Sequence, residues 1–171
     1  MLTAGHMVEH SVLSGVVAPA IVLAWAALGL PRLRGRYPLV AWGAFVAAQW
    51  VFHLTPLLAD SRDNAVLHTA EHLAFIAIGV WFWIPVLSRE AGLSDPGRSL
   101  YLFGAAPAID LVGVMLISRG EPAAGVAMLA GGMPIVIAAV WVTWSWIARE
   151  HREARAMEAA KAMEAQRVAT G

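Results

Sequence analysis

The apolar run at residues 66–88 reads VLHTAEHLAFIAIGVWFWIPVLS, and Glu71 is the only Asp, Glu, Lys or Arg residue in it. An α-helix needs about 20 mostly apolar residues to cross the hydrocarbon core of a bilayer, so this run predicts a transmembrane helix. On either side of it, further runs of the same kind lie at residues 8–30, 38–59, 99–118 and 123–147. We therefore predict an all-α integral membrane protein, a bundle of five transmembrane helices.

The composition supports a membrane protein and excludes several other classes. Charged residues make up 14% of the 171 residues, whereas an ordinary soluble domain has about a quarter. A formal net charge of zero gives no electrostatic support for binding nucleic acid. The absence of cysteine excludes disulfides, thiolate zinc sites, iron–sulfur clusters and cysteine nucleophiles. Any metal ion must therefore be held by His, Met, Asp or Glu.

The distribution of Lys and Arg between the loops predicts the orientation in the membrane, because positive residues concentrate on the cytoplasmic side. One side carries the first loop, the third loop and the tail, with Arg32, Arg34, Arg36, Arg89, Arg98, Arg149, Arg152, Arg155, Lys161 and Arg167. The other side carries only Arg62 and Arg119. This bias predicts a multi-pass protein of a bacterial-type inner (plasma) membrane, with the N-terminus outside and the C-terminus in the cytoplasm.

Two parts of the chain are predicted, a transmembrane helical domain at residues 1–147 and a charged cytoplasmic tail at residues 148–171. The first 31 residues contain no Lys or Arg, so the first span lacks the positive n-region of a cleavable signal peptide and is predicted to be retained. The tail is rich in Ala, Glu, Lys and Arg, with i,i+4 pairs such as Arg149 and Glu153. This pattern predicts that the tail continues the last helix.

Histidines gather on the predicted outer side of the membrane. They are His6, His10, His53, His68 and His72. The pairs His6/His10 and His68/His72 have i,i+4 spacing, which stacks two imidazoles on one helix face within about 6 Å of rise. A lone histidine near a membrane interface is usually a packing or anchoring residue, but two pairs and a fifth histidine at a comparable depth predict a metal or cofactor site. The sixth histidine, His151, lies in the tail and is not assigned to the site.

Both pairs share the pattern His-x-x-Glu-His, with Glu9 in the first and Glu71 in the second. Beside a metal, these carboxylates would accept a ring N–H from a ligand histidine or carry protons. The same pattern occurs in inverted zincins, where Glu is the general base of a zinc protease. We interpret the protein as non-enzymatic, because the pattern occurs twice at helix entrances and no separate domain is available to present a peptide.

The available ligands favour copper. Imidazoles with thioethers and no thiolate suit Cu(I) or Cu(II), with zinc, iron or haem as alternatives. Asp110, inside the fourth span, is costly in hydrocarbon and is predicted to face the bundle interior, as a structural hydrogen bond or as a proton or metal contact. Four methionines lie in or near the outer halves of spans: Met7, Met115, Met128 and Met133. Any one of them is more often core filler than a ligand. The residues predicted to surround the metal ligands are Met7, Glu9, Glu71 and Asp110.

Several stretches resemble the signatures of CtaG-like cytochrome c oxidase assembly factors, a family of multi-span membrane proteins. They are His6-Met7-x-x-His10, Tyr37-Pro38, Val51-Phe52-His53-Leu54-Thr55-Pro56, and Leu67-His68-Thr69-Ala70-Glu71-His72-Leu73-Ala74-Phe75 with Trp81-Phe82-Trp83-Ile84-Pro85. The residues that depart from the family's usual pattern are Ser11, Ala18, Phe52 and Thr55. The chain also lacks the additional spans of longer relatives.

The resemblance implies a short family member that handles copper during maturation of a haem–copper cytochrome c oxidase and is not itself catalytic. It implies a partner that is an oxidase subunit or another copper carrier, within the lipid bilayer, and leaves homo-oligomerisation open. The copper ligands that it implies are His6, His10, His53, His68 and His72. Two alternatives remain from the residues themselves: a bis-His haem protein for electron transfer, or a structural subunit whose histidines are interface residues.

Overall fold

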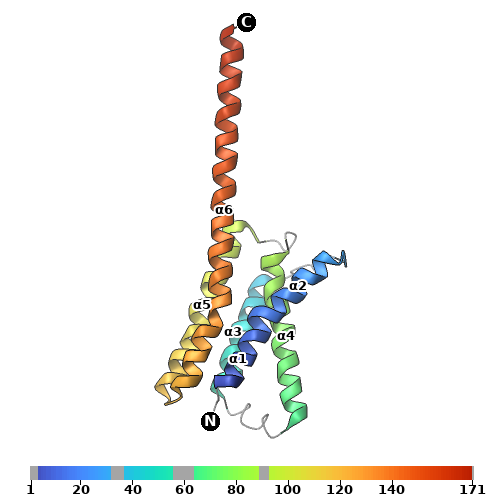
Figure 1. The fold of residues 1–171 in the computed structure, drawn as a ribbon, viewed down its shortest axis with the longest axis vertical. Coiled ribbons are helices and arrows are strands. Elements are labelled where there is room, and N and C mark those ends of the chain that lie inside the picture. The colour runs from blue at the N-terminus through green and yellow to red at the C-terminus, as the bar shows by residue number, and fades with distance from the viewer. Residues whose placement is uncertain (1–3, 32–36, 56–63, 89–92, 171) are drawn as a thin grey trace.

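The computed structural model describes residues 4–31, 37–55, 64–88 and 93–170. These residues form helices joined by short connections, with no strand among them. Figure 1 shows the helices as a bundle from which the last one projects far beyond the others. The helices are α1 (Ala4–Val12), the π-helix η1 (Leu13–Val17), α2 (Ala18–Ala27), α3 (Pro38–Leu54), α4 (Ala65–Leu87), α5 (Asp95–Ser118) and α6 (Pro122–Thr170).

Most of these helices have the length and composition of membrane spans. By these two criteria, four stretches of the part of the chain that the structure describes could cross a bilayer: Ala4–Ala27, Ala65–Leu87, Asp95–Ser118 and Pro122–Ala169. α3 is equally apolar but has 17 residues, and the end of the span predicted at 38–59 lies outside the described residues. α3 ends where Thr55 takes an extended backbone with ψ 159°, because a following proline disfavours the α conformation. The helices indicate a multi-pass membrane protein, as predicted.

Local sequence signals set the helix boundaries. The side chain of Asn64 accepts hydrogen bonds from two backbone N–H groups in the first turn of α4, at 3.0 and 3.3 Å. Ser94 caps α5 in the same way, accepting from the backbone N–H of Gly97 at 3.2 Å. Gly120 has φ +83° in the turn between α5 and α6, a left-handed conformation that suits glycine. This turn folds α5 and α6 into a helical hairpin.

Small residues allow the helices to pack closely. A Cβ on Gly125 of α6 would lie 2.5 Å from the carbonyl oxygen of Gly113 in α5. A Cβ on Gly79 of α4 would lie 2.8 Å from the Cβ of Ala18 at the start of α2. Membrane helices use such small residues to bring their backbones together. α3 packs against α4 and α5, and the buried side chains of the core include Phe45, Phe75, Phe82, Leu102 and Leu116.

The π-helical turn η1 fixes the first membrane helix against α4. The backbone N–H of Ala18 bonds to the carbonyl of Leu13, so the carbonyl of Ser14 would need a donor from residue 19. That residue is Pro19, which has no N–H. Instead, the indole N–H of Trp83 in α4 donates to the carbonyl of Ser14 at 2.8 Å, in a buried position. This bond links the π-helical turn directly to α4.

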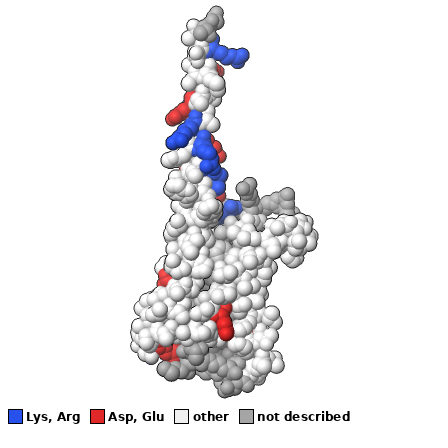
Figure 2. All heavy atoms as spheres, in the orientation of Figure 1, with Lys and Arg blue, Asp and Glu red and all other residues white. Residues whose placement is uncertain are grey.

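α6 continues beyond the bundle, as the composition of the tail predicts. Its side chains from 150 to 169 are all exposed, and residues 150–170 are called the stalk here. Arg149 pairs with Asp95 at 2.6 Å where α6 leaves the bundle, and Figure 2 shows Lys and Arg gathered along the stalk. The N-terminus lies at the opposite end of the bundle (Figure 1). Five of the loop arginines used to predict orientation lie outside the described residues: Arg32, Arg34, Arg36, Arg62 and Arg89.

Candidate metal centre

The structure brings together all five histidines that the sequence assigned to the site, at the end of the bundle that carries the N-terminus. We call them the histidine cluster: His6 and His10 from α1, His53 from α3, and His68 and His72 from α4. His10 lies at the centre of the cluster. Its ring centroid is 4.1 Å from that of His6, and 5.3 Å from those of His53 and His72. His151 lies apart, exposed in the stalk.

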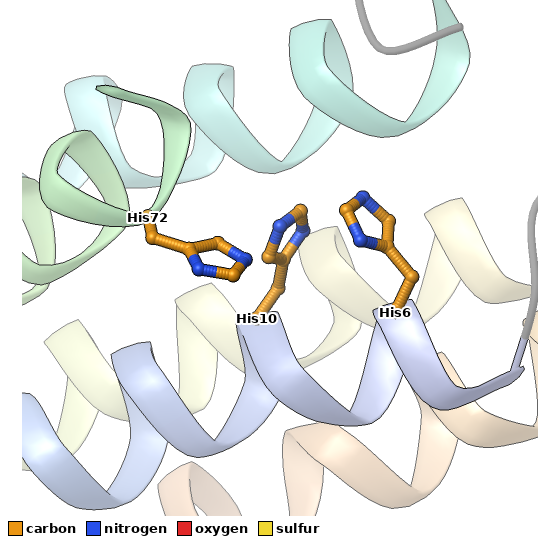
Figure 3. A group of neighbouring side chains, drawn as sticks. All are labelled: His6, His10 and His72. Atoms are coloured by element: carbon orange, nitrogen blue, oxygen red, sulfur yellow. The ribbon is translucent and has the colours of Figure 1, made fainter. Parts of the chain in front are cut away.

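Among the described residues, two groups of side chains could hold a metal ion, and His6, His10 and His72 form the first, which we call the buried triad. Each offers one ring nitrogen, and these atoms lie within 4.8 Å of one another. Figure 3 shows the ring of His10 between the other two. His6 and His10 are 6% and 1% exposed, whereas His72 is 26% exposed. Since metal–imidazole bonds are about 2 Å long, small side-chain rotations would let the three nitrogens share one ion.

Glu9, His68 and His72 form the second group, the open triad, whose ligand atoms also lie within 4.8 Å of one another. It is more accessible, because Glu9 is 57% exposed and His68 is half-buried. His72 belongs to both groups. Nδ1 of His68 and Nε2 of His72 are buried and make no hydrogen bond to the described residues. A buried polar atom without a partner is unfavourable, and a bound cation would satisfy these nitrogens.

The carboxylates of the two His-x-x-Glu-His patterns cross between helices. Oε1 of Glu71, on α4, lies 3.0 Å from Nε2 of His10 and 3.5 Å from Nε2 of His6, both on α1. Oε2 of Glu9, on α1, lies 3.9 Å from Nε2 of His72 on α4. Glu71 is buried, so its charge needs compensation by a proton or a cation within the cluster. Each helix thus brings a carboxylate to the histidines of the other.

A chain of hydrogen bonds orients His10. Nδ1 of His53 lies 2.7 Å from the backbone carbonyl oxygen of Gln49, which can only accept, so this nitrogen donates. A neutral His53 then offers Nε2 as an acceptor, 3.2 Å from Nδ1 of His10, which donates to it. A neutral His10 therefore keeps the lone pair on Nε2, the nitrogen that lies beside Glu71. This is the tautomer that a metal ligand requires.

The model of the cytochrome c oxidase caa3 assembly factor family (Caa3_CtaG) matches residues 1–149 of the chain. The chain belongs to the Caa3_CtaG family. The match confirms the family that the sequence motifs indicated. It includes the whole histidine cluster and ends at Arg149, where α6 leaves the bundle. Comparison with curated proteins gave no match, and neither did comparison with solved structures.

Two other residues were predicted near the metal in this Caa3_CtaG member, Met7 and Asp110. Met7 is fully buried in the hydrophobic core, and Asp110 lies on α5, which contributes no histidine. Oδ1 of Asp110 packs against Gly132, where a Cβ would lie only 2.8 Å away. Neither triad includes Asp110 or His53, and the two ring nitrogens of His53 face the carbonyl of Gln49 and the ring of His10. Among the other methionines, Met128 is buried and Met133 is 52% exposed.

Sequence reasoning missed two contributors to the site. Gln49 provides the carbonyl that fixes His53, and its i,i+4 spacing before His53 was the available signal. Phe75 stacks on His10 with ring centroids 4.2 Å apart and an interplanar angle of 24°. Phe75 lies one helical turn after Glu71, so both reach the face of α4 that meets α1. Phe75 thus packs directly on the ring of His10, and Gln49 acts on it through His53.

Proposed function

We propose that this protein binds copper in the histidine cluster and passes it to a subunit of a haem–copper cytochrome c oxidase during assembly of that enzyme. The family supports a role in oxidase assembly and favours a non-enzymatic protein. The observation that carries the copper proposal is the hydrogen-bond chain from Gln49 through His53 to His10. It leaves a buried imidazole lone pair aimed into a group of histidines and a carboxylate.

Copper fits the chemistry of these ligands better than most metals. The buried triad supplies three imidazoles, and the chain has no cysteine that would favour a closed thiolate zinc site. Three protein ligands leave a coordination position open. A ligand from a receiving protein can occupy that position before the bonds from the histidines to the ion break, which suits delivery of the ion.

The position of the cluster supports an extracytoplasmic site. The cluster and the N-terminus lie at one end of the bundle, and the stalk with its Lys and Arg residues leaves from the other (Figures 1 and 2). Positive residues stay in the cytoplasm of a bacterial cell, so the stalk belongs inside and the histidines outside. Copper would then be held where it can reach an oxidase subunit from the outer face of the plasma membrane.

The test is the copper content of the full chain purified without chelators or affinity metals, followed by titration with Cu(I) under reducing conditions. We expect one bound ion per chain, and its loss in the double variant His10→Ala, His72→Ala. The matched control is His151→Ala in the stalk, which should bind like the wild type. Wild-type protein without affinity for copper, or a double variant with full occupancy and unchanged affinity, would overturn the proposal.

A further inference from the structure

We propose that the histidine cluster contains two overlapping copper sites that are used in sequence, with His72 as the ligand common to both. The open triad of Glu9, His68 and His72 would receive and release the ion, and the buried triad of His6, His10 and His72 would hold it. This inference rests on the proposed function, because it divides the same histidine cluster into a site where copper enters and leaves and a site where copper is held. The chemical class of the ligand is a soft or borderline transition-metal ion.

Burial forms a gradient through the cluster. Glu9 is 57% exposed and His68 is half-buried, His72 is 26% exposed, and His6 and His10 are 6% and 1% exposed. An ion arriving from water therefore meets Glu9 and His68 before it meets His10. His72 lies between the two groups, with its ring 4.2 Å from that of His68 and 5.3 Å from that of His10.

The two sets of donors differ in a way that gives the transfer a direction. The open triad contains a carboxylate, a hard anionic ligand that attracts any cation and holds a soft ion weakly. The buried triad contains only imidazoles, which are better ligands for copper, and Glu71 lies 3.0 Å from His10 to balance the charge. The carboxylate of the open triad thus attracts the ion near the surface, and the imidazole nitrogens of the buried triad then hold it.

The shared ligand removes the need to free the ion during transfer. The bond to His72 persists while the bonds to the oxygen of Glu9 and a nitrogen of His68 break and bonds to nitrogens of His6 and His10 form. The oxidation state of the ion does not change, and the entering nitrogens act through lone pairs, so no electron has to be supplied. A proton that balances the charge of Glu71 in the empty buried triad would be released to water as the ion enters and takes over that balance. Because both triads need His72, we expect one ion per chain.

The experiment follows Cu(I) in the detergent-purified full chain, with loading from a weak copper complex and removal by an excess of a water-soluble chromophoric chelator. The double variant Glu9→Gln, His68→Ala should reach the same occupancy as the wild type but load and release copper about tenfold more slowly. The double variant His6→Ala, His10→Ala should lose its copper to the chelator at least about tenfold faster. His72→Ala should impair both.

The matched control is Glu153→Gln, His151→Ala, which removes the same two side chains from the exposed stalk. A second measurement needs no variant: Cu(II) mixed with wild-type protein and frozen early should show fewer nitrogen couplings in its electron paramagnetic resonance spectrum than an equilibrated sample. Wild-type rates in the Glu9/His68 variant, or identical early and late spectra, would overturn the two-site inference while leaving copper binding intact. Wild-type protein that binds no copper would overturn the proposed function itself.

Discussion

Replacing His53 by alanine tests whether His53 only orients the copper ligand His10 or binds copper itself. In the structure both ring nitrogens of His53 already have partners, the carbonyl of Gln49 and Nδ1 of His10, and His53 belongs to neither triad. Loss of such an orienting partner typically weakens metal binding about 10- to 100-fold, which is about 1.4–2.7 kcal/mol. We therefore expect His53→Ala to keep one copper ion per chain with a dissociation constant raised by that factor. His10 Nδ1 would also lose its acceptor, at a cost of about 1–3 kcal/mol of stability.

The assay is a competition titration of Cu(I) against a chromophoric chelator, with the number of coordinated nitrogens measured on the Cu(II) form. The matched control is Gln49→Met, because His53 is held by the backbone carbonyl of Gln49 and not by its side chain. This variant should retain the wild-type affinity. Loss of the ion as complete as in His10→Ala would make His53 a direct ligand and refute the reasoning, as would an affinity that does not change at all.

Three further predictions concern the scaffold. Trp83→Phe removes the indole donor to the Ser14 carbonyl in η1, so it should lower the free energy of unfolding in detergent by about 1–2 kcal/mol. The control Trp144→Phe, at a position 70% exposed, should have little effect, and equal effects of the two variants would contradict the role of the π-helical turn. Gly125→Ala should separate α5 from α6 and lower the unfolding temperature. A Cβ on Gly43 of α3 meets nothing within 4 Å, so the control Gly43→Ala should leave the unfolding temperature unchanged or raise it. An unchanged unfolding temperature in Gly125→Ala would show that the hairpin is not closely packed there. Truncation after Arg149 should leave the affinity for copper unchanged in a chelator competition, because the stalk is exposed along its described length, and a weakened site would show that the stalk contributes to it.

The membrane helices could be predicted from single stretches of sequence, but their internal irregularities could not. Residues 66–88 predicted a helix that the structure places at Ala65–Leu87. The π-helical turn at Leu13–Val17 was not predicted, because it depends on a donor from α4 that replaces the N–H missing at Pro19. The end of α3 at Leu54 was not predicted either, because the loss of helical conformation at Thr55 depends on the residue that follows it, and the rest of the span predicted at 38–59 lies outside the described residues.

For the candidate site too, relations within one helix could be predicted from the sequence and relations between helices could not. The i,i+4 spacing of His6 and His10 placed them on one face of a helix, because that relation is fixed by 3.6 residues per turn. The sequence did not reveal that His10 is central, that Glu71 reaches across to it, or that His53 orients it. These relations depend on the rotation and depth of one helix relative to another.

Taken alone, the sequence determined the apolar helices, the clustering of histidines toward one end, and the family. A bilayer forces each spanning segment to satisfy its own backbone hydrogen bonds, so hydropathy over about 20 residues suffices to predict a helix. Only the tertiary structure decided which nitrogens and carboxylates meet, through contacts such as that between Gly79 and Ala18 and the bond from Trp83 to Ser14. Such contacts join residues far apart in the chain, and the periodicity of a single helix carries no information about them.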